Sequence, residues 1–443
     1  MSCPPALSRR RLLASAGVTT MTALAGCTRI YSTLPDRITY ARTRRREIPT
    51  VPSPVFGTDA HLHDLADETA EYVDPGLEAW ERVGEREHRV HYTQSRLERA
   101  AEFAAERDWE SPTTETVQSG RAHLWNAAGS YAYATAQLDE FDRDPTAGAA
   151  DSLEEAETRH QEFEYATGDP AIFLAYGRYV ERELQQAHSL LSRRVDAEVE
   201  DRRERTSRAE RIAELYSGVR QAQARIDSAV AYREALREHD PGSDPFGEAM
   251  ADARAILHDR VDPLLESREE WSERIGEFDG DGIGESETGR RDVHDALYSR
   301  SSYGESAVSD ANRRVDGGYD VYGTVELANG WLHLAAARAE CERIESDGID
   351  LLDSGAIDAA KRAAIDRLEG VLADDPGQLT LFFAAEARSW ITAGDSGIER
   401  SSLDDAEEEW RWSQANGYAR YLLAKGILER IDEAVAVVTD TGE

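Results

Sequence analysis

The stretch 212-IAELYSGVRQAQARIDSAVAYREAL-236 decides the fold class of this chain. Its apolar residues recur at spacings of three and four, which places their side chains on one face of an α-helix. That face comprises Ile212, Leu215, Val219, Ala222, Ile226, Ala229 and Leu236, and it is interrupted only at Arg233. A continuous apolar face of this length packs against a partner helix, and the nearest partner lies in the same chain. The stretch therefore predicts long helices packed side by side.

A second apolar face lies earlier in the chain. It is formed, at the same spacing, by Val180, Leu184, Ala187 and Leu191. The stretch 200–208 between the two faces contains one threonine, one serine and otherwise charged residues. Such a stretch is either an exposed part of one very long helix or the turn of a helical hairpin. The pattern is consistent with both.

Helical spacing continues over most of the remaining chain, and a strand-like alternation is debatable only at 319–327. We therefore predict an all-α fold, in which long antiparallel helices form a bundle that is followed by a smaller helical-hairpin stack. The glycine- and acid-rich segment 279–289 is the predicted domain boundary. The predicted organisation is a signal peptide at 1–26, an anchored stem at 27–58, a helical bundle at 59–278, a linker at 279–289, a helical domain at 290–438 and a tail at 439–443.

The composition is strongly acidic. The 443 residues include 87 acidic and 51 basic side chains, so the formal net charge is −36, and the mean hydropathy is −0.61. These values exclude a multi-spanning membrane protein and a nucleic-acid binder that works through a basic field. Only three cysteines are present, which excludes a disulfide scaffold. Because only Lys361 and Lys425 are lysines, the composition resembles that of proteins from extremely halophilic archaea.

The N-terminus carries an export pattern. Arg9 and Arg10 follow a serine and precede a weakly apolar stretch that extends to Ala25. This arrangement resembles a twin-arginine export signal, and the apolar stretch is too short to span a bilayer stably. The resemblance implies that the chain is exported.

A second motif follows directly. Leu24, Ala25, Gly26 and Cys27 resemble a lipobox, in which the cysteine thiol receives a lipid and becomes the first residue of the mature protein. The resemblance implies an anchor in the external face of the cell membrane, with membrane lipid as the partner of Cys27. It covers only about the first 30 residues, and it implies nothing about the folded part.

The predicted stem contains two kinds of residues. Arginines are concentrated within 28–50, and prolines occur at 35, 49, 52 and 54. Arginines beside an anionic lipid surface would strengthen the anchor, whereas a plain tether would need only the extended conformation that prolines favour. Both interpretations remain open.

Candidate metal sites are weak. Asp279, Asp281 and Gly284 fit an EF-hand calcium loop, but Ile283 and Arg290 occupy positions that need oxygen ligands. A flexible acidic linker is the default interpretation.

Two Glu-x-x-His pairs, Glu85/His88 and Glu157/His160, are typical of di-iron bundles, with Glu68 and Glu115 as further candidates. The numbers of glutamates and histidines give about one such pair by chance, so we predict no metal site and no cofactor.

Catalytic chemistry is not indicated either. Motifs for serine hydrolases, phosphate loops and dinucleotide binding are missing from the sequence, and Cys341 is expected to be a buried, inert thiol. Most aromatic residues of the second part are expected in the core, whereas Trp412 lies off the apolar face and is a candidate surface anchor.

We therefore predict no catalytic residue and no enzymatic activity. The expected function is that of a membrane-anchored lipoprotein that acts as an envelope interaction or scaffold module, with a possible protein partner and no nucleic acid. The alternative is a ligand- or metal-binding receptor, such as the solute-binding lipoprotein of a transporter.

Overall fold

The computed structural model describes residues 39–53, 59–84, 91–106, 108–109, 112–195, 197, 207–277, 285–347, 354–399 and 407–440. The prediction of an all-α fold is confirmed, because the strands among these residues, β1 and β2, have two residues each. The elements are α3 (Asp59–Gly84), α4 (His91–Ala105), α5 (Thr114–Gln137), α6 (Ala149–Gln161), β1 (Ala166–Thr167), α7 (Pro170–Leu191), α8 (Arg208–His239), β2 (Asp244–Pro245), α9 (Gly247–Glu277), α10 (Glu285–Asp316), α11 (Asp320–Asp347), α12 (Ser354–Ala373), α13 (Gln378–Glu399), α14 (Glu407–Leu428) and α15 (Ile431–Thr439).

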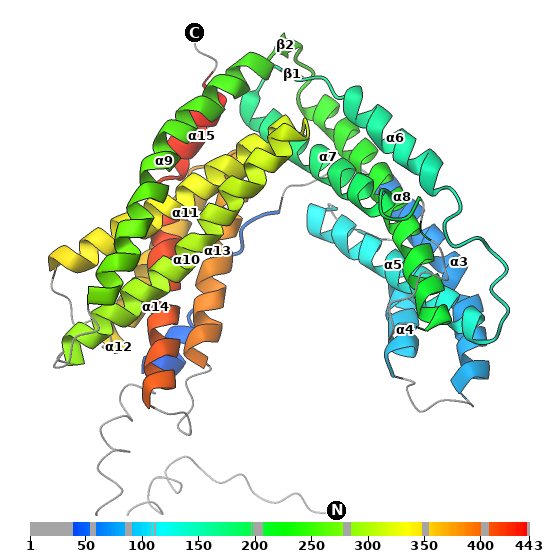
Figure 1. Cartoon of the computed structure of the whole chain (residues 1–443), viewed down its shortest axis with the longest axis horizontal. Coiled ribbons are helices and arrows are strands. Elements are labelled where there is room, and N and C mark those ends of the chain that lie inside the picture. The colour runs from blue at the N-terminus through cyan, green and yellow to red at the C-terminus, as the bar shows by residue number, and fades with distance from the viewer. Residues whose placement is uncertain are drawn as a thin grey trace, which may run out of the picture.

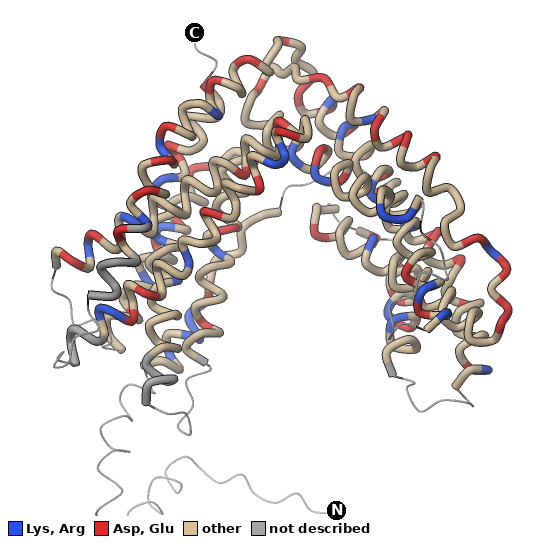
Figure 2. The backbone as a smooth tube through the Cα atoms, viewed as in Figure 1, with Lys and Arg blue, Asp and Glu red and all other residues tan. Residues whose placement is uncertain are grey.

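The helices form an arch with two arms (Figure 1). The N-terminal arm contains α3 to α8, and the C-terminal arm contains α9 to α15. The arms meet where α7 packs against α11, α13 and α15. At the top of the arch, β1 and β2 form an antiparallel pair in which Ala166 faces Pro245 and Thr167 faces Asp244. Acidic residues are distributed along both arms (Figure 2).

The two apolar faces found in the sequence pack against each other. All the apolar residues that define them are buried, and α7 and α8 are extensively packed neighbours. Helix α7 ends at Leu191, and Ser207 begins α8 with a capping box in which Glu210 takes part. The structure therefore forms a helical hairpin, which is one of the two arrangements that the sequence left open.

The division between the arms lies earlier than the sequence indicated. Helix α9 packs against α10, α11 and α15 of the C-terminal arm, whereas the sequence prediction placed it in the first domain, before 279–289. The junction is the turn at 240–246. There the Asp240 carboxylate accepts hydrogen bonds from Thr167 Oγ1, from Gly168 N at 2.8 Å and from Gly242 N at 3.1 Å. The turn also contains glycine and proline, but it is short and held by these hydrogen bonds, whereas the prediction relied on the longer glycine- and acid-rich segment 279–289.

Local sequence signals were overridden at three further places. Helix α3 continues through Pro75 and α9 through Pro263, although proline removes a backbone hydrogen bond in each case. Burial of Val73, Ala79 and Trp80 on both sides of Pro75 favours the continuous helix. The debated stretch 319–327 forms the start of α11 and contains no strand. None of the described helices is long and apolar enough to cross a membrane.

Candidate functional site

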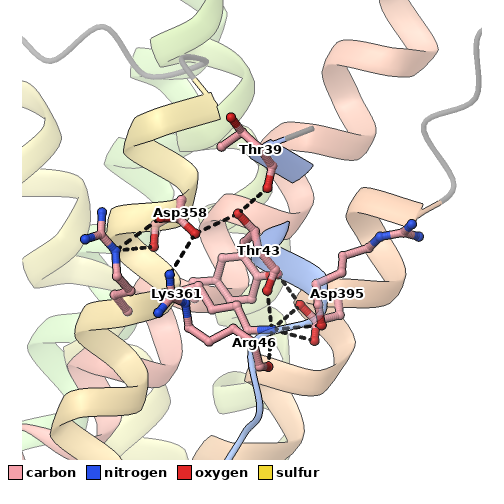
Figure 3. A network of polar contacts seen from close by, with 9 residues as sticks. Thr39, Thr43, Arg46, Asp358, Lys361 and Asp395 are labelled. Carbon is pink, nitrogen blue, oxygen red and sulfur yellow. Dashed lines mark hydrogen bonds and ion pairs between the residues drawn. The ribbon is translucent and has the colours of Figure 1, made fainter. Parts of the chain in front are cut away.

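A buried lysine joins the N-terminal segment to the C-terminal arm (Figure 3). Lys361 lies on α12, and its side chain is 0% exposed. Its Nζ donates to the backbone carbonyls of Thr43 at 2.9 Å and Arg46 at 3.2 Å, and to both carboxylate oxygens of Asp395 at 2.8 Å. These carbonyls lie at the C-terminal end of the helical segment 39–44, where a cation is favourable. Lys361 therefore caps that segment and pairs with α13.

Further polar contacts surround Lys361. Thr43 Oγ1 donates to Asp358 Oδ1 at 2.9 Å, and Arg46 forms an ion pair with the same carboxylate at 3.3 Å. Burial opposes ionisation of Asp358, but these hydrogen bonds hold the pKa of its carboxyl below the usual value. Burial lowers the pKa of the Lys361 ammonium, and the Asp395 carboxylate opposes that effect.

The segment 39–53 is thus part of the folded C-terminal arm. Tyr40 and Val51 are buried in the hydrophobic core, and Arg388 Nε donates to the Pro49 carbonyl at 2.9 Å. The sequence prediction treated 27–58 as an anchored stem, either beside lipid or as a plain tether. The packing of 39–53 differs from both, and the rest of that stem lies outside the described residues.

A groove crosses the N-terminal arm. It has a volume of about 950 Å³ and is lined by residues of α4, α5, α7 and α8 together with Arg194. Tyr92 on α4 is 78% exposed and Trp125 on α5 is 40% exposed, although both are large and apolar. Two exposed aromatic side chains in one concave surface are typical of a binding site.

Polar groups line the same groove. Ser130 Oγ and Arg194 Nε line it as buried atoms without a hydrogen-bond partner. Arg194 Nη1 is held by the Leu190 carbonyl at 2.7 Å. The two glutamates of the groove have partners of their own, because Glu210 accepts from the Ser207 backbone and Glu214 pairs with Arg211. The groove therefore combines aromatic contact area with a few placed polar groups.

The residues predicted for export and anchoring lie outside the described residues. These are Arg9, Arg10, Leu24, Ala25, Gly26 and Cys27. The candidate calcium-loop residues Asp279, Asp281 and Gly284 and the pair Glu85/His88 also lie outside them.

The second Glu-x-x-His pair is described, and its members have different neighbours. Glu157 lies 3.4 Å from His188, whereas the His160 ring stacks on Tyr319 at 4.2 Å and makes a 3.1 Å hydrogen bond with the Gly318 carbonyl. Among the described residues, no group of three or more histidine, cysteine, aspartate or glutamate side chains is arranged to hold a metal ion.

The expected burial of most aromatic residues of the second part and of Cys341 is confirmed. Trp331, Trp390, Tyr418, Tyr421 and Phe383 are buried, and Trp412 is 38% exposed. Cys341 is buried in the C-terminal arm.

Sequence reasoning missed Lys361 and the groove. The one available signal for Lys361 was the rarity of lysine in this chain together with its position among alanines of a helix.

Two family models match the chain, and each covers one arm. Residues 60–243 match a family described as Domain of unknown function (DUF8262), and residues 247–440 match one described as Domain of unknown function (DUF8264). No curated protein and no solved structure matches the chain. The limits of the two matches lie on either side of β2, so they agree with the division between the arms.

Proposed function

We propose that this protein is a membrane-anchored lipoprotein that acts non-catalytically as an interaction or scaffold module of the cell envelope. The observation that supports it is the attachment of 39–53 to the C-terminal arm through Lys361. The proposed lipid on Cys27 precedes Thr39 by a dozen residues, which span at most about 40 Å when extended. The C-terminal arm would therefore stay close to the membrane.

The N-terminal arm would then be the part that reaches a partner. Its groove presents Tyr92 and Trp125, the types of side chain that dominate the energetics of protein interfaces. An arch with one arm held at the membrane and one arm carrying a groove suits a module that positions a second protein. Cys27 and the folded arms have separate tasks in this proposal, which are anchoring and binding.

A receptor for a small ligand is the second candidate. The volume of the groove, about 950 Å³, lies within the range of ligand sites, roughly 300–1,000 Å³. A small ligand in the groove would change the fluorescence of Trp125, which is identified as the emission that is lost in Trp125→Phe. If none of a panel of small polar solutes changes this emission, the receptor function is rejected.

The anchor is tested by membrane fractionation of Cys27→Ser. We expect the variant to move from the membrane fraction to the soluble fraction, because the lipid would lose its attachment atom. Cys341→Ser is the matched control, since its thiol is buried in the C-terminal arm and lies outside the lipobox motif, and it should stay with the membranes. If Cys27→Ser sediments with membranes as the parent protein does, the lipoprotein proposal is wrong.

A further inference from the structure

Three arginines surround one glutamate inside the N-terminal arm. Glu183 on α7 has a side chain that is 0% exposed. The guanidinium groups of Arg121 on α5, Arg182 on α7 and Arg225 on α8 all contact its carboxylate. The side chain of Arg121 is 5% exposed, and those of Arg182 and Arg225 are each 17% exposed. The cluster therefore connects three helices of the arm at a position that is almost closed to water.

Both oxygens of the carboxylate face guanidinium groups. Glu183 Oε1 accepts from Arg121 Nη2 at 3.0 Å and from Arg182 Nη2 at 2.8 Å. Glu183 Oε2 lies 2.7 Å from Arg121 Nη1 and accepts from Arg225 Nη1. Arg182 Nε also donates to Oε1, at 3.3 Å, so each oxygen lies against two guanidinium groups.

The cluster holds more positive than negative charge. Three guanidinium groups face one carboxylate, and no second carboxylate pairs with them among the described residues. Arg121 Nε and Arg225 Nε are buried without a hydrogen-bond partner. A buried charge without a counter-charge is strongly unfavourable. This local excess contrasts with the net charge of −36 of the whole chain.

The neighbouring side chains do not supply the negative charge. His61 Nε2 makes a 2.9 Å hydrogen bond with Ser228 Oγ. Burial, with the nearby Arg121 charge, lowers the pKa of His61 to about 4, so this imidazole is neutral near pH 7. Burial raises the pKa of the Tyr232 hydroxyl, which is therefore neutral as well. Neither of these two side chains compensates the two extra positive charges.

We propose that the cluster formed by Arg121, Arg182, Arg225 and Glu183 binds a small inorganic anion of the halide class, with chloride as the ligand. The arginines supply the charge and the spare N–H donors that an anion requires. The low exposure of all four side chains excludes large organic anions. The bound anion stabilises the N-terminal arm by neutralising part of the excess charge.

The test compares anions at constant sodium concentration and ionic strength. Thermal unfolding of the full chain is measured in sodium chloride, sodium bromide and sodium gluconate. We expect the wild-type protein to unfold at a higher temperature in the two halides, by on the order of 2–4 °C. In Arg225→Gln, this difference between halide and gluconate should largely disappear, because one of the excess charges is gone.

The control is Arg254→Gln. Arg254 pairs with its own carboxylate, Asp320, at 2.9 Å, so this variant should keep the wild-type difference. An equal anion dependence in all three proteins would overturn the proposal. If Arg225→Gln does not fold, Arg182→Gln replaces it, since its side chain also reaches the edge of the cluster. Anomalous diffraction from wild-type crystals in sodium bromide should show bromide beside these arginines, and a bromide map without that peak would also overturn the proposal.

Discussion

Lys361 keeps an ammonium group inside the C-terminal arm, where water cannot solvate it. The cost of removing this charge from water is offset by Asp395 and by the carbonyls at the end of the helical segment 39–44. Tyr421 also donates to Asp395 Oδ1, at 2.6 Å. One side chain thus satisfies groups from the N-terminal segment and from α13, so its loss affects both.

Lys361→Met should destabilise the protein by about 2–3 kcal/mol, because Asp395 and the carbonyls lose their donor in a largely buried setting. Unfolding by urea at high salt measures this change. Lys425→Met is the matched control, because Lys425 is 25% exposed and pairs with Glu340 and Glu429; there we expect a change below about 1 kcal/mol. Similar losses in both variants would contradict the role assigned to Lys361.

At the scale of elements, one glutamate links the two arms. Glu181 on α7 is completely buried, and it accepts from the Tyr322 backbone N–H at 2.7 Å and from the Tyr165 hydroxyl at 2.8 Å. The Tyr322 N–H belongs to the first turn of α11, so Glu181 caps a helix of the other arm. Burial raises the pKa of this carboxyl to about 8, although its hydrogen bonds oppose the shift.

This shift predicts a loss of stability as pH rises. Between pH 6.5 and 8, folded Glu181 holds a proton that the unfolded chain releases, so the free energy of unfolding should fall as pH rises. Above about pH 8 this contribution is already lost. Burial lowers the pKa of His61 to about 4. Below pH 6.5 this histidine makes the free energy of unfolding rise with pH, so the window for Glu181 starts at pH 6.5.

The comparison uses Glu181→Gln, which keeps the neutral form at every pH, so thermal unfolding should depend less on pH in this window. Asp227→Asn serves as the control, because burial raises the pKa of Asp227 only to about 6. An unchanged pH dependence in Glu181→Gln would show that Glu181 ionises normally.

At the scale of the whole molecule, the arch separates the docked segment 39–53 from the groove. Residues 39–53 pack on the C-terminal arm (Figure 1), whereas the groove is lined by residues of the N-terminal arm. The arms are joined through α7, which packs against α11, α13 and α15. A partner held by the groove would therefore lie beside the N-terminal arm, away from the attachment of the stem.

Cross-linking from two positions tests this arrangement. Tyr92→Cys places an exposed thiol at the groove, and Ile256→Cys places one on α9, where the side chain is 41% exposed. With a photo-reactive maleimide on native membranes, we expect a discrete cross-linked product from position 92 and none from position 256. The buried thiol of Cys341 should not react. Identical products from both positions, or none from position 92, would argue against a partner in the groove.

The sequence by itself determined the helical class, the apolar faces of α7 and α8 and the burial of Cys341 and most aromatic residues. Those features depend on spacing along one helix, which the order of residues specifies directly. It did not determine that α9 belongs to the C-terminal arm or that 39–53 docks there, and it did not bring Arg121 and Arg225 to Glu183. These features depend on contacts between residues far apart in the chain, and only the packing of the helices decided which charged side chains meet inside them.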